Sequence, residues 1–222
     1  RNGYLQGPPL LLAKTEGTTP FRLSLHVGDV GHTLVVGPTG AGKSVLLALL
    51  ALQFRRYPGA RIIAFDFGRS LRAACLGMSG DWHDLGNPDS DQVRLQPLRN
   101  IDDNAERTWA AEWVESILAH QGVVATPAVR EHVWSALNAL ASALPNERTL
   151  TGLCVMLQSL ALKQALQPYC AGGAHSALLD AECETVSLSD VAVFETQGLI
   201  GTSAAPAVLS YLFHRIEQQL DV

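Results

Sequence analysis

The chain has 222 residues, of which 47% are hydrophobic and 17% are charged, with a formal net charge of −5. This length and composition predict a folded globular body, as one large domain or one domain with an insertion. No apolar run reaches the roughly 18 to 20 residues of a membrane-spanning helix. The acidic balance argues against a protein that coats duplex nucleic acid.

The ends and the cysteines give weaker indications. Residues 1–4 contain neither an initiator Met nor a secretory signal, which is typical of a segment of a longer protein. The four cysteines are dispersed, with no C-x-x-C pair and no nearby His at a metal-ligand spacing. We therefore expect reduced thiols in a cytosolic protein.

Two short strands are expected at the beginning of the chain. Residues 1–20 are rich in Gly, Pro and Thr and predict an irregular leading segment with one strand at Leu10–Ala13. From Phe21 to Val27 apolar and polar residues alternate, which predicts a half-buried strand, and residues 28–32 predict the turn that follows it.

The strongest motif comes next. Residues 37–44 have the sequence GPTGAGKS, which matches the phosphate-binding pattern G-x-x-x-x-G-K-[ST] at every fixed position. The apolar run Thr33–Val36 predicts a strand leading into the loop, and Val45–Phe54 predicts a helix leading out of it. The alternative is a glycine-rich turn before an ordinary helix, but a strand, a glycine loop and a helix in succession are the context that nucleotide binding requires.

The residue types of this loop suit a phosphate chain. The three glycines allow backbone conformations closed to other residues, so that successive N–H groups point at an anion at the helix N-terminus. We expect Lys43 to act catalytically on the β- and γ-phosphates of ATP and Ser44 to bind Mg²⁺. Pro38 has no N–H and shapes the loop. The expected nucleotide-binding residues are Gly37, Pro38, Thr39, Gly40, Ala41, Gly42, Lys43, Ser44 and Val45.

After this helix the pattern predicts a parallel sheet. Arg61–Asp66 predicts a buried strand that would complete a βαβ unit with the strand before the loop. A short helix that starts at residues 68–70 and extends to about Cys75, and a strand at 80–86, follow. The arginines close to this region are interpreted as a solvated rim, with contact to a neighbouring subunit or a nucleic acid as the alternative; they are Arg55, Arg56, Arg61, Arg69 and Arg72.

Residues 102–167 predict three consecutive amphipathic helices. The first is capped by Asp102 or Asp103, the second begins near Pro127, and the third extends from Thr149 to Leu166. We expect their tryptophans to form a core and not a base-stacking platform. A strand at 191–195 and a final helix at 206–220 follow. The predicted organisation is a first part of the core at 1–100, a helical insertion at 101–170 and a return to the core at 171–222.

Nucleotide hydrolysis also needs an acid at the end of an apolar strand to organise the metal. Asp66 ends the strand 61–66, and the alternatives of a metal-site ligand and an acid that caps the following turn stay open. Glu195 ends the strand 191–195 and is the weaker candidate. Neither is followed by a second acid.

The chain resembles the conjugative-transfer ATPases of the TrbE and VirB/CagE type, which energise type IV secretion systems. The stretches that carry the resemblance are residues 19–29, 31–36 leading into the loop, 51–57, 63–66, 80–82 and 211–217. It covers nearly the whole chain. It implies an α/β, RecA-like P-loop NTPase with a helical insertion, acting as a hexamer with inner-membrane secretion subunits at the cytoplasmic face of the membrane.

Two departures limit what the resemblance implies. The position after Asp66 is usually Lys in this family and is Phe67 here. The strand with the metal-organising Asp and the catalytic Glu, and the arginine finger after it, are expected beyond Val222, so this chain alone is expected to hydrolyse ATP poorly. The alternatives are a DNA-translocating motor of the coupling-protein or FtsK-like kind and a nucleotide-binding assembly scaffold.

Overall fold

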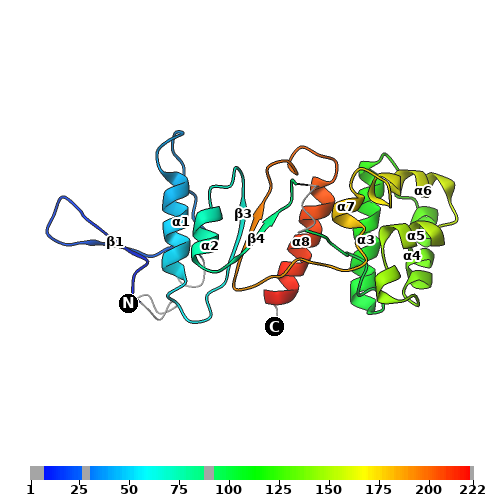
Figure 1. Cartoon of the computed structure of the whole chain (residues 1–222), viewed down its shortest axis with the longest axis horizontal. Helices are drawn as coiled ribbons and strands as arrows, with labels where there is room; N and C mark the ends of the chain where they lie inside the picture. The colour runs from blue at the N-terminus through cyan, green and yellow to red at the C-terminus, as the bar shows by residue number, and fades with distance from the viewer. Residues whose placement is uncertain (1–7, 27–30, 88–92, 221–222) are drawn as a thin grey trace. The chain divides into compact units, whose positions relative to one another are not determined.

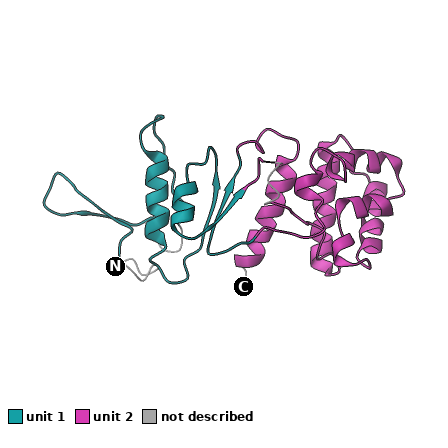
Figure 2. Ribbon diagram, in the orientation of Figure 1, with its two compact units in different colours: residues 1–83, 187–196 teal, residues 84–186, 197–222 magenta. Residues whose placement is uncertain are grey.

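The structure is a computed structural model that describes residues 8–26, 31–87 and 93–220 (Figure 1). The chain divides into two compact units, coloured separately in Figure 2. Unit 1 comprises residues 1–83 and 187–196, and unit 2 comprises residues 84–186 and 197–222.

The described residues of unit 1 form two small sheets. Strands β1 (Leu11–Ala13) and β2 (Phe21–Leu23) pair antiparallel. In the other sheet β5 (Val191–Glu195) lies between β3 (Ile62–Asp66) and β4 (Asp81–Asp84). Strands β3 and β5 are parallel, so their carboxyl ends lie at one edge of the sheet. The strands predicted at 10–13, 61–66, 80–86 and 191–195 are confirmed in position.

The alternation of side chains along β5 explains how the sheet is covered. Val191 and Val193 pack on one face against buried Cys75 of helix α2 (Arg72–Gly77). On the other face Phe194 stacks on Phe65 and His83, with ring centroids 5.3 and 5.1 Å apart. Successive residues of a strand face opposite sides, so the apolar residues 191–194 of β5 are buried on both faces of the sheet.

The strand predicted at Thr33–Val36 is not formed. The side chains of Leu34 and Val36 are 87% and 82% exposed, and no described segment pairs with this stretch. β-branched residues favour an extended backbone, but a strand also needs a neighbour to accept its hydrogen bonds. The βαβ unit predicted there is therefore wrong for the described residues. Helix α1 (Lys43–Phe54) is confirmed.

The predicted strand over Phe21–Val27 is also shorter than expected. It ends at Leu23, while Val27 and residues 28–30 of the predicted turn lie outside the described residues, as do residues 1–4 and 221–222.

Unit 2 is helical. Asp103 caps α3 (Asn104–His120) by accepting hydrogen bonds from two backbone N–H groups, and Thr126 caps α4 (Pro127–Leu140). The remaining elements are η1 (Pro145–Glu147), α5 (Leu150–Met156), α6 (Leu160–Leu166), η2 (Gln167–Tyr169), α7 (Ser176–Leu179) and α8 (Ala205–Leu220). The first two predicted helices and the final helix are confirmed.

The third predicted helix is two helices. The backbone is extended at Leu157 (ψ 138°) and at Ser159 (ψ 121°), which separates α5 from α6. Leu153 and Leu162 are both buried. Nine positions apart in one helix, they would point to opposite faces, because a helix turns about 100° per residue. The break lets both enter the same core.

The tryptophans of unit 2 are partly in its core, as predicted. Trp113 is buried and its Nε1 donates to the carbonyl oxygen of Ala207 in α8, at 2.9 Å. Trp109 stacks on Trp113 and on His214. Trp134 is 38% exposed, with the guanidinium of Arg107 5.7 Å from its ring centre, so the prediction is wrong for this residue. The predicted boundaries at 100 and 170 stay a prediction.

Candidate functional site: the glycine loop and the strand-end acids

The glycine loop is a turn that leads directly into α1. Gly40 (φ 80°) and Gly42 (φ 83°) have left-handed backbones, a conformation that costs residues with a Cβ. Gly42 is the N-cap of α1 and offers no side chain to the first-turn N–H groups. Those N–H groups and the helix dipole therefore make this end of α1 suited to an anion.

Lys43 closes the loop on itself. Its Nζ donates to the carbonyl oxygens of Gly37 and Pro38, both at 2.7 Å. The ammonium is thus held inside the loop at the helix N-terminus by two neutral acceptors. A phosphate oxygen would offer a charged acceptor to the same group, and charge-assisted hydrogen bonds are stronger than neutral ones.

Gly37 differs from the other two loop glycines. Its φ is not in the left-handed region, and a Cβ built on it would lie 3.7 Å from the Cβ of Ala41, an ordinary contact. Of the three glycines expected to allow a backbone closed to other residues, Gly40 and Gly42 adopt one and Gly37 does not. Thr39, Ala41, Ser44 and Val45 are exposed along the loop.

Asp66 is buried at the carboxyl end of β3, and both oxygens of its carboxylate accept hydrogen bonds. One oxygen accepts from the hydroxyl of Ser70 at 2.6 Å and the other from the N–H of Leu71 at 2.7 Å. This is the turn-capping arrangement that the sequence left open as one of two alternatives.

Glu195 lies opposite Asp66 in the register of β3 and β5, and its side chain is completely buried. Its two oxygens accept from the N–H groups of Gly68 at 3.1 Å and Arg69 at 2.5 Å. Both of those residues have positive φ, 87° and 60°. Two successive N–H groups turned toward one anion form a small anion-binding nest, and Glu195 fills it.

The sequence indicated both acids but not this nest. A Gly directly after an apolar strand is a weak sequence signal for such a nest. No local sequence pattern indicated the left-handed conformation of Arg69. Sequence reasoning missed the contact between residues 68–69 and a carboxylate more than 120 positions later.

The hydrogen bonds of Asp66 and Glu195 determine how these acids could bind a metal ion. Among the described residues no group of three or more His, Cys, Asp and Glu side chains is placed to hold one. The oxygen ligands that the loop side chains offer to a nucleotide-bound Mg²⁺ are the exposed hydroxyls of Thr39 and Ser44. Asp66 would have to share or release its contacts with Ser70 and Leu71 to take part.

The arginines after the loop make internal contacts. Arg56 donates to the carbonyl oxygens of Pro9 and Leu10 at 3.0 and 3.1 Å, and Arg55 pairs with Asp190 at 3.4 Å. All five arginines of the predicted rim are exposed, as expected, and Arg55 and Arg56 also make these internal contacts. The contacts tie the end of α1 to the rest of unit 1.

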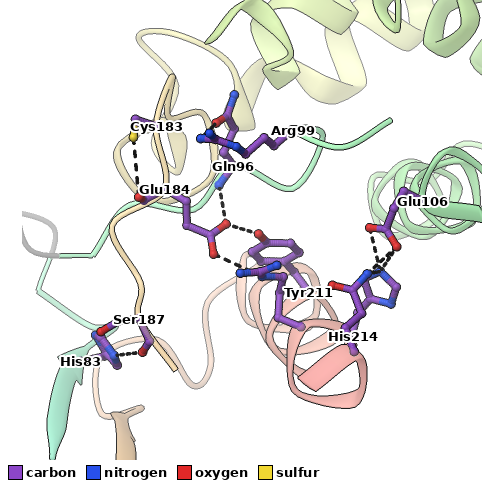
Figure 3. A network of polar contacts seen from close by, with 11 residues as sticks. His83, Gln96, Arg99, Glu106, Cys183, Glu184, Ser187, Tyr211 and His214 are labelled. Carbon is purple, nitrogen blue, oxygen red and sulfur yellow. Dashed lines mark hydrogen bonds and ion pairs between the residues drawn. The ribbon is translucent and has the colours of Figure 1, made fainter. Parts of the chain in front are cut away.

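A second polar group of residues lies in unit 2 on α8. Tyr211 donates to the carboxylate of Glu184, which also pairs with Arg215 at 3.3 Å. His214 contacts Glu106 of α3 at 3.2 Å (Figure 3). Burial is the main reason that the pKa of the Tyr211 hydroxyl lies far above its ordinary value, with the Glu184 charge second. These contacts attach α8 to α3 and to the segment around Glu184, and no sequence pattern indicated them.

An α/β arrangement with a glycine phosphate loop at the start of a helix defines the class: the chain is a P-loop NTPase. Its fold is that of the solved VirB4 of Thermoanaerobacter pseudethanolicus, with a TM-score of 0.66 and 19% identity over 96% of this chain and 65% of that one. No family model matches the chain.

Curated relatives give the family. The chain is 43% identical to a probable conjugal transfer protein TrbE of Sinorhizobium fredii, over 98% of the chain and 33% of that protein. It is 41% identical to the conjugal transfer protein TrbE of Rhizobium radiobacter, over 98% of the chain and 27% of that protein. VirB4 proteins of type IV secretion systems also match over nearly the whole chain. The chain belongs to the TrbE/VirB4 family and spans about a third or less of the length of these relatives.

Proposed function

We propose that this chain is the nucleotide-binding part of a conjugal-transfer ATPase and that it binds ATP with Mg²⁺ through residues 37–45. The observation that carries the proposal is the loop itself, in which two left-handed glycines precede an α1 N-terminus that Gly42 caps with no side chain. The similarity to TrbE and VirB4 proteins supports the transport role.

Within this proposal Lys43, the N–H groups at the start of α1 and Ser44 contact different parts of the bound nucleotide. Lys43 leaves the carbonyl oxygens of Gly37 and Pro38 and donates to phosphate oxygens instead. The N–H groups at the start of α1 bind the phosphate chain. Ser44 supplies a hydroxyl to Mg²⁺, which would neutralise charge on the phosphates.

We expect ATP binding and ATP hydrolysis to differ in this chain. Asp66 and Glu195 hold the 68–71 turn through four hydrogen bonds to Gly68, Arg69, Ser70 and Leu71. We infer from these contacts that both acids serve to hold the turn. We expect the chain to bind ATP and to hydrolyse it very slowly, since the carboxylates of both acids are occupied by these hydrogen bonds. A steady-state turnover of ordinary ATPase size from the pure chain would contradict this expectation.

The direct test is a binding titration with a fluorescent ATP analogue and Mg²⁺. Lys43→Ala removes the only side-chain cation of residues 37–45, and we expect at least a tenfold loss of affinity, the value of one charge-assisted hydrogen bond. The matched control is Lys14→Ala, which removes an exposed lysine of the same unit. Equal affinities of Lys43→Ala and the unmodified chain would overturn the proposal.

The same titration tests Asp66. Asp66→Asn should leave the Mg²⁺ dependence of binding unchanged if its carboxylate serves only the turn. A requirement for higher Mg²⁺ in this variant, with the fold intact by circular dichroism, would instead assign Asp66 to the metal.

The partners and location of the complete protein are part of this proposal. The names of the relatives support work with type IV secretion subunits, and we propose a hexamer at the cytoplasmic face of the inner membrane. Among the described residues no helix combines the length and hydrophobicity needed to cross a membrane. Light scattering of the complete protein with and without ATP tests the hexamer, and DNA-stimulated ATPase activity would favour a DNA-translocating motor.

A further inference from the structure

Two cysteines that are far apart in the sequence meet in unit 2. The Sγ atom of Cys154, on α5, lies 3.1 Å from the Sγ atom of Cys170, directly after η2. The whole of α6 lies between them in the chain. Each thiol also faces a carbonyl oxygen of α6: that of Lys163 at 3.9 Å from Cys154, and that of Leu166 at 3.3 Å from Cys170.

The two thiols differ in exposure and acidity. Cys170 is 4% exposed, whereas Cys154 is half-buried and can be reached from solvent. The hydrogen bond from Cys170 is the main cause that lowers the pKa of the Cys154 thiol. Burial and the charge of Asp180 oppose this shift, and the charge of Lys163 supports it. The same hydrogen bond, together with burial, raises the pKa of Cys170 far above its usual value. Cys154 is therefore the more acidic and more accessible thiol of the pair, and the exchange begins at its sulfur.

We propose that Cys154 and Cys170 are a dithiol that a small disulfide of the glutathione class oxidises reversibly to an intramolecular disulfide, which joins α5 to the segment after η2. The observation that carries this is the direct contact of the two sulfur atoms, which need to close only from 3.1 Å to about 2.05 Å.

The exchange takes two steps. The Cys154 thiolate attacks one sulfur of the oxidant, the oxidant's S–S bond breaks, and one small thiolate leaves. Cys170 then gives its proton to water and attacks the Cys154 sulfur of the mixed disulfide, which releases the second small thiolate. Two protein thiols are oxidised and one small disulfide is reduced to two thiols.

The second step is helped by the first. While Cys154 is a thiolate, its charge and its hydrogen bond hold the proton on Cys170. Once Cys154 is capped by the small thiol it carries no charge, and both effects are removed. The buried Cys170 is then the resolving thiol, already in contact with the sulfur that it attacks.

The other two cysteines serve as internal comparisons. Cys75 is fully buried under the sheet of unit 1 and is screened from an oxidant. Cys183 is exposed and has no cysteine partner among the described residues, so it forms only a mixed disulfide. Cys183→Ser is therefore a suitable background, since it removes the one accessible thiol outside the pair.

The test equilibrates the Cys183→Ser chain with glutathione at a series of oxidised-to-reduced ratios, followed by acid quenching and intact-mass measurement. We expect a species lighter by two hydrogen atoms and, after digestion, a linked peptide joining Cys154 to Cys170. In the additional Cys170→Ser variant the product should be a stable glutathione adduct on Cys154. The oxidised chain should unfold roughly 5 to 10 °C higher than the reduced one, as for a loop of this length, and reductant should reverse the shift.

The linkage itself is measured without changing either cysteine of the pair, so a poorly folded Cys170→Ser variant does not affect the outcome. Glutathione adducts without a linked peptide in the Cys183→Ser chain would overturn the proposal. So would a linked peptide that contains Cys75.

Discussion

The most discriminating substitution in this chain is at Glu195, because it distinguishes a structural acid from a catalytic one. Glu195→Gln keeps the volume of the side chain and one acceptor oxygen but replaces the other with an NH₂ group. One of the two N–H groups of Gly68 and Arg69 then faces a donor in a completely buried position. Losing one charge-assisted hydrogen bond there costs about 2 to 3 kcal/mol.

The cost should be concentrated at the nest. Arg69 is kept in a left-handed conformation that costs a residue with a Cβ about 1 to 2 kcal/mol, so weakening its hydrogen bond favours local opening. Amide hydrogen exchange at residues 68 and 69 measures this opening directly. We expect it to accelerate about 30- to 150-fold, the equivalent of 2 to 3 kcal/mol.

The control is Asp190→Asn in the same unit. Asp190 pairs with Arg55 at 3.4 Å, but its side chain is 65% exposed, and exposed ion pairs contribute about 0 to 1 kcal/mol. Exchange at residues 68 and 69 should barely change in this variant. If Glu195→Gln leaves those amides within about threefold of the unmodified rate while nucleotide affinity falls, Glu195 acts at the nucleotide and does not hold the nest.

Three further predictions concern other parts of the chain. Gly42→Ala should lower stability by about 1 to 2 kcal/mol in thermal unfolding, because its φ is 83°, whereas Gly37→Ala should be nearly neutral. Gly86→Ala should prevent normal folding of unit 2, seen as lost far-ultraviolet dichroism, since its Cβ would lie 1.9 Å from a backbone oxygen. The pKa of Asp81 is lowered in the folded chain, mainly by a hydrogen bond from Ser187 at 2.7 Å. The ionised carboxylate therefore stabilises the fold above the unfolded pKa of about 3.9, and this stabilisation is lost as the pH falls through the lower pKa of the folded state. Asp81→Asn should therefore cost more at pH 7 than at pH 3 in urea unfolding, and an equal cost would contradict the assignment.

Much of the site and the helices could be predicted from local sequence. The glycine loop and α1 follow from residues that are neighbours in the chain, because backbone freedom at Gly40 and Gly42 and a helix-forming run after them act over a few positions. The caps at Asp103 and Thr126 are equally local. The family resemblance, which rests on such stretches, is confirmed by the TrbE relatives.

The tertiary structure decided whatever depends on a partner distant in the sequence. Residues 33–36 have the composition of a strand, but a strand forms only where another segment accepts its hydrogen bonds, and the described part of the chain provides none. The helix predicted over 149–166 breaks because its buried leucines could not all face one core. Glu195 finds its nest and Cys154 its thiol partner through packing alone, since the residues that meet there are not neighbours in the chain.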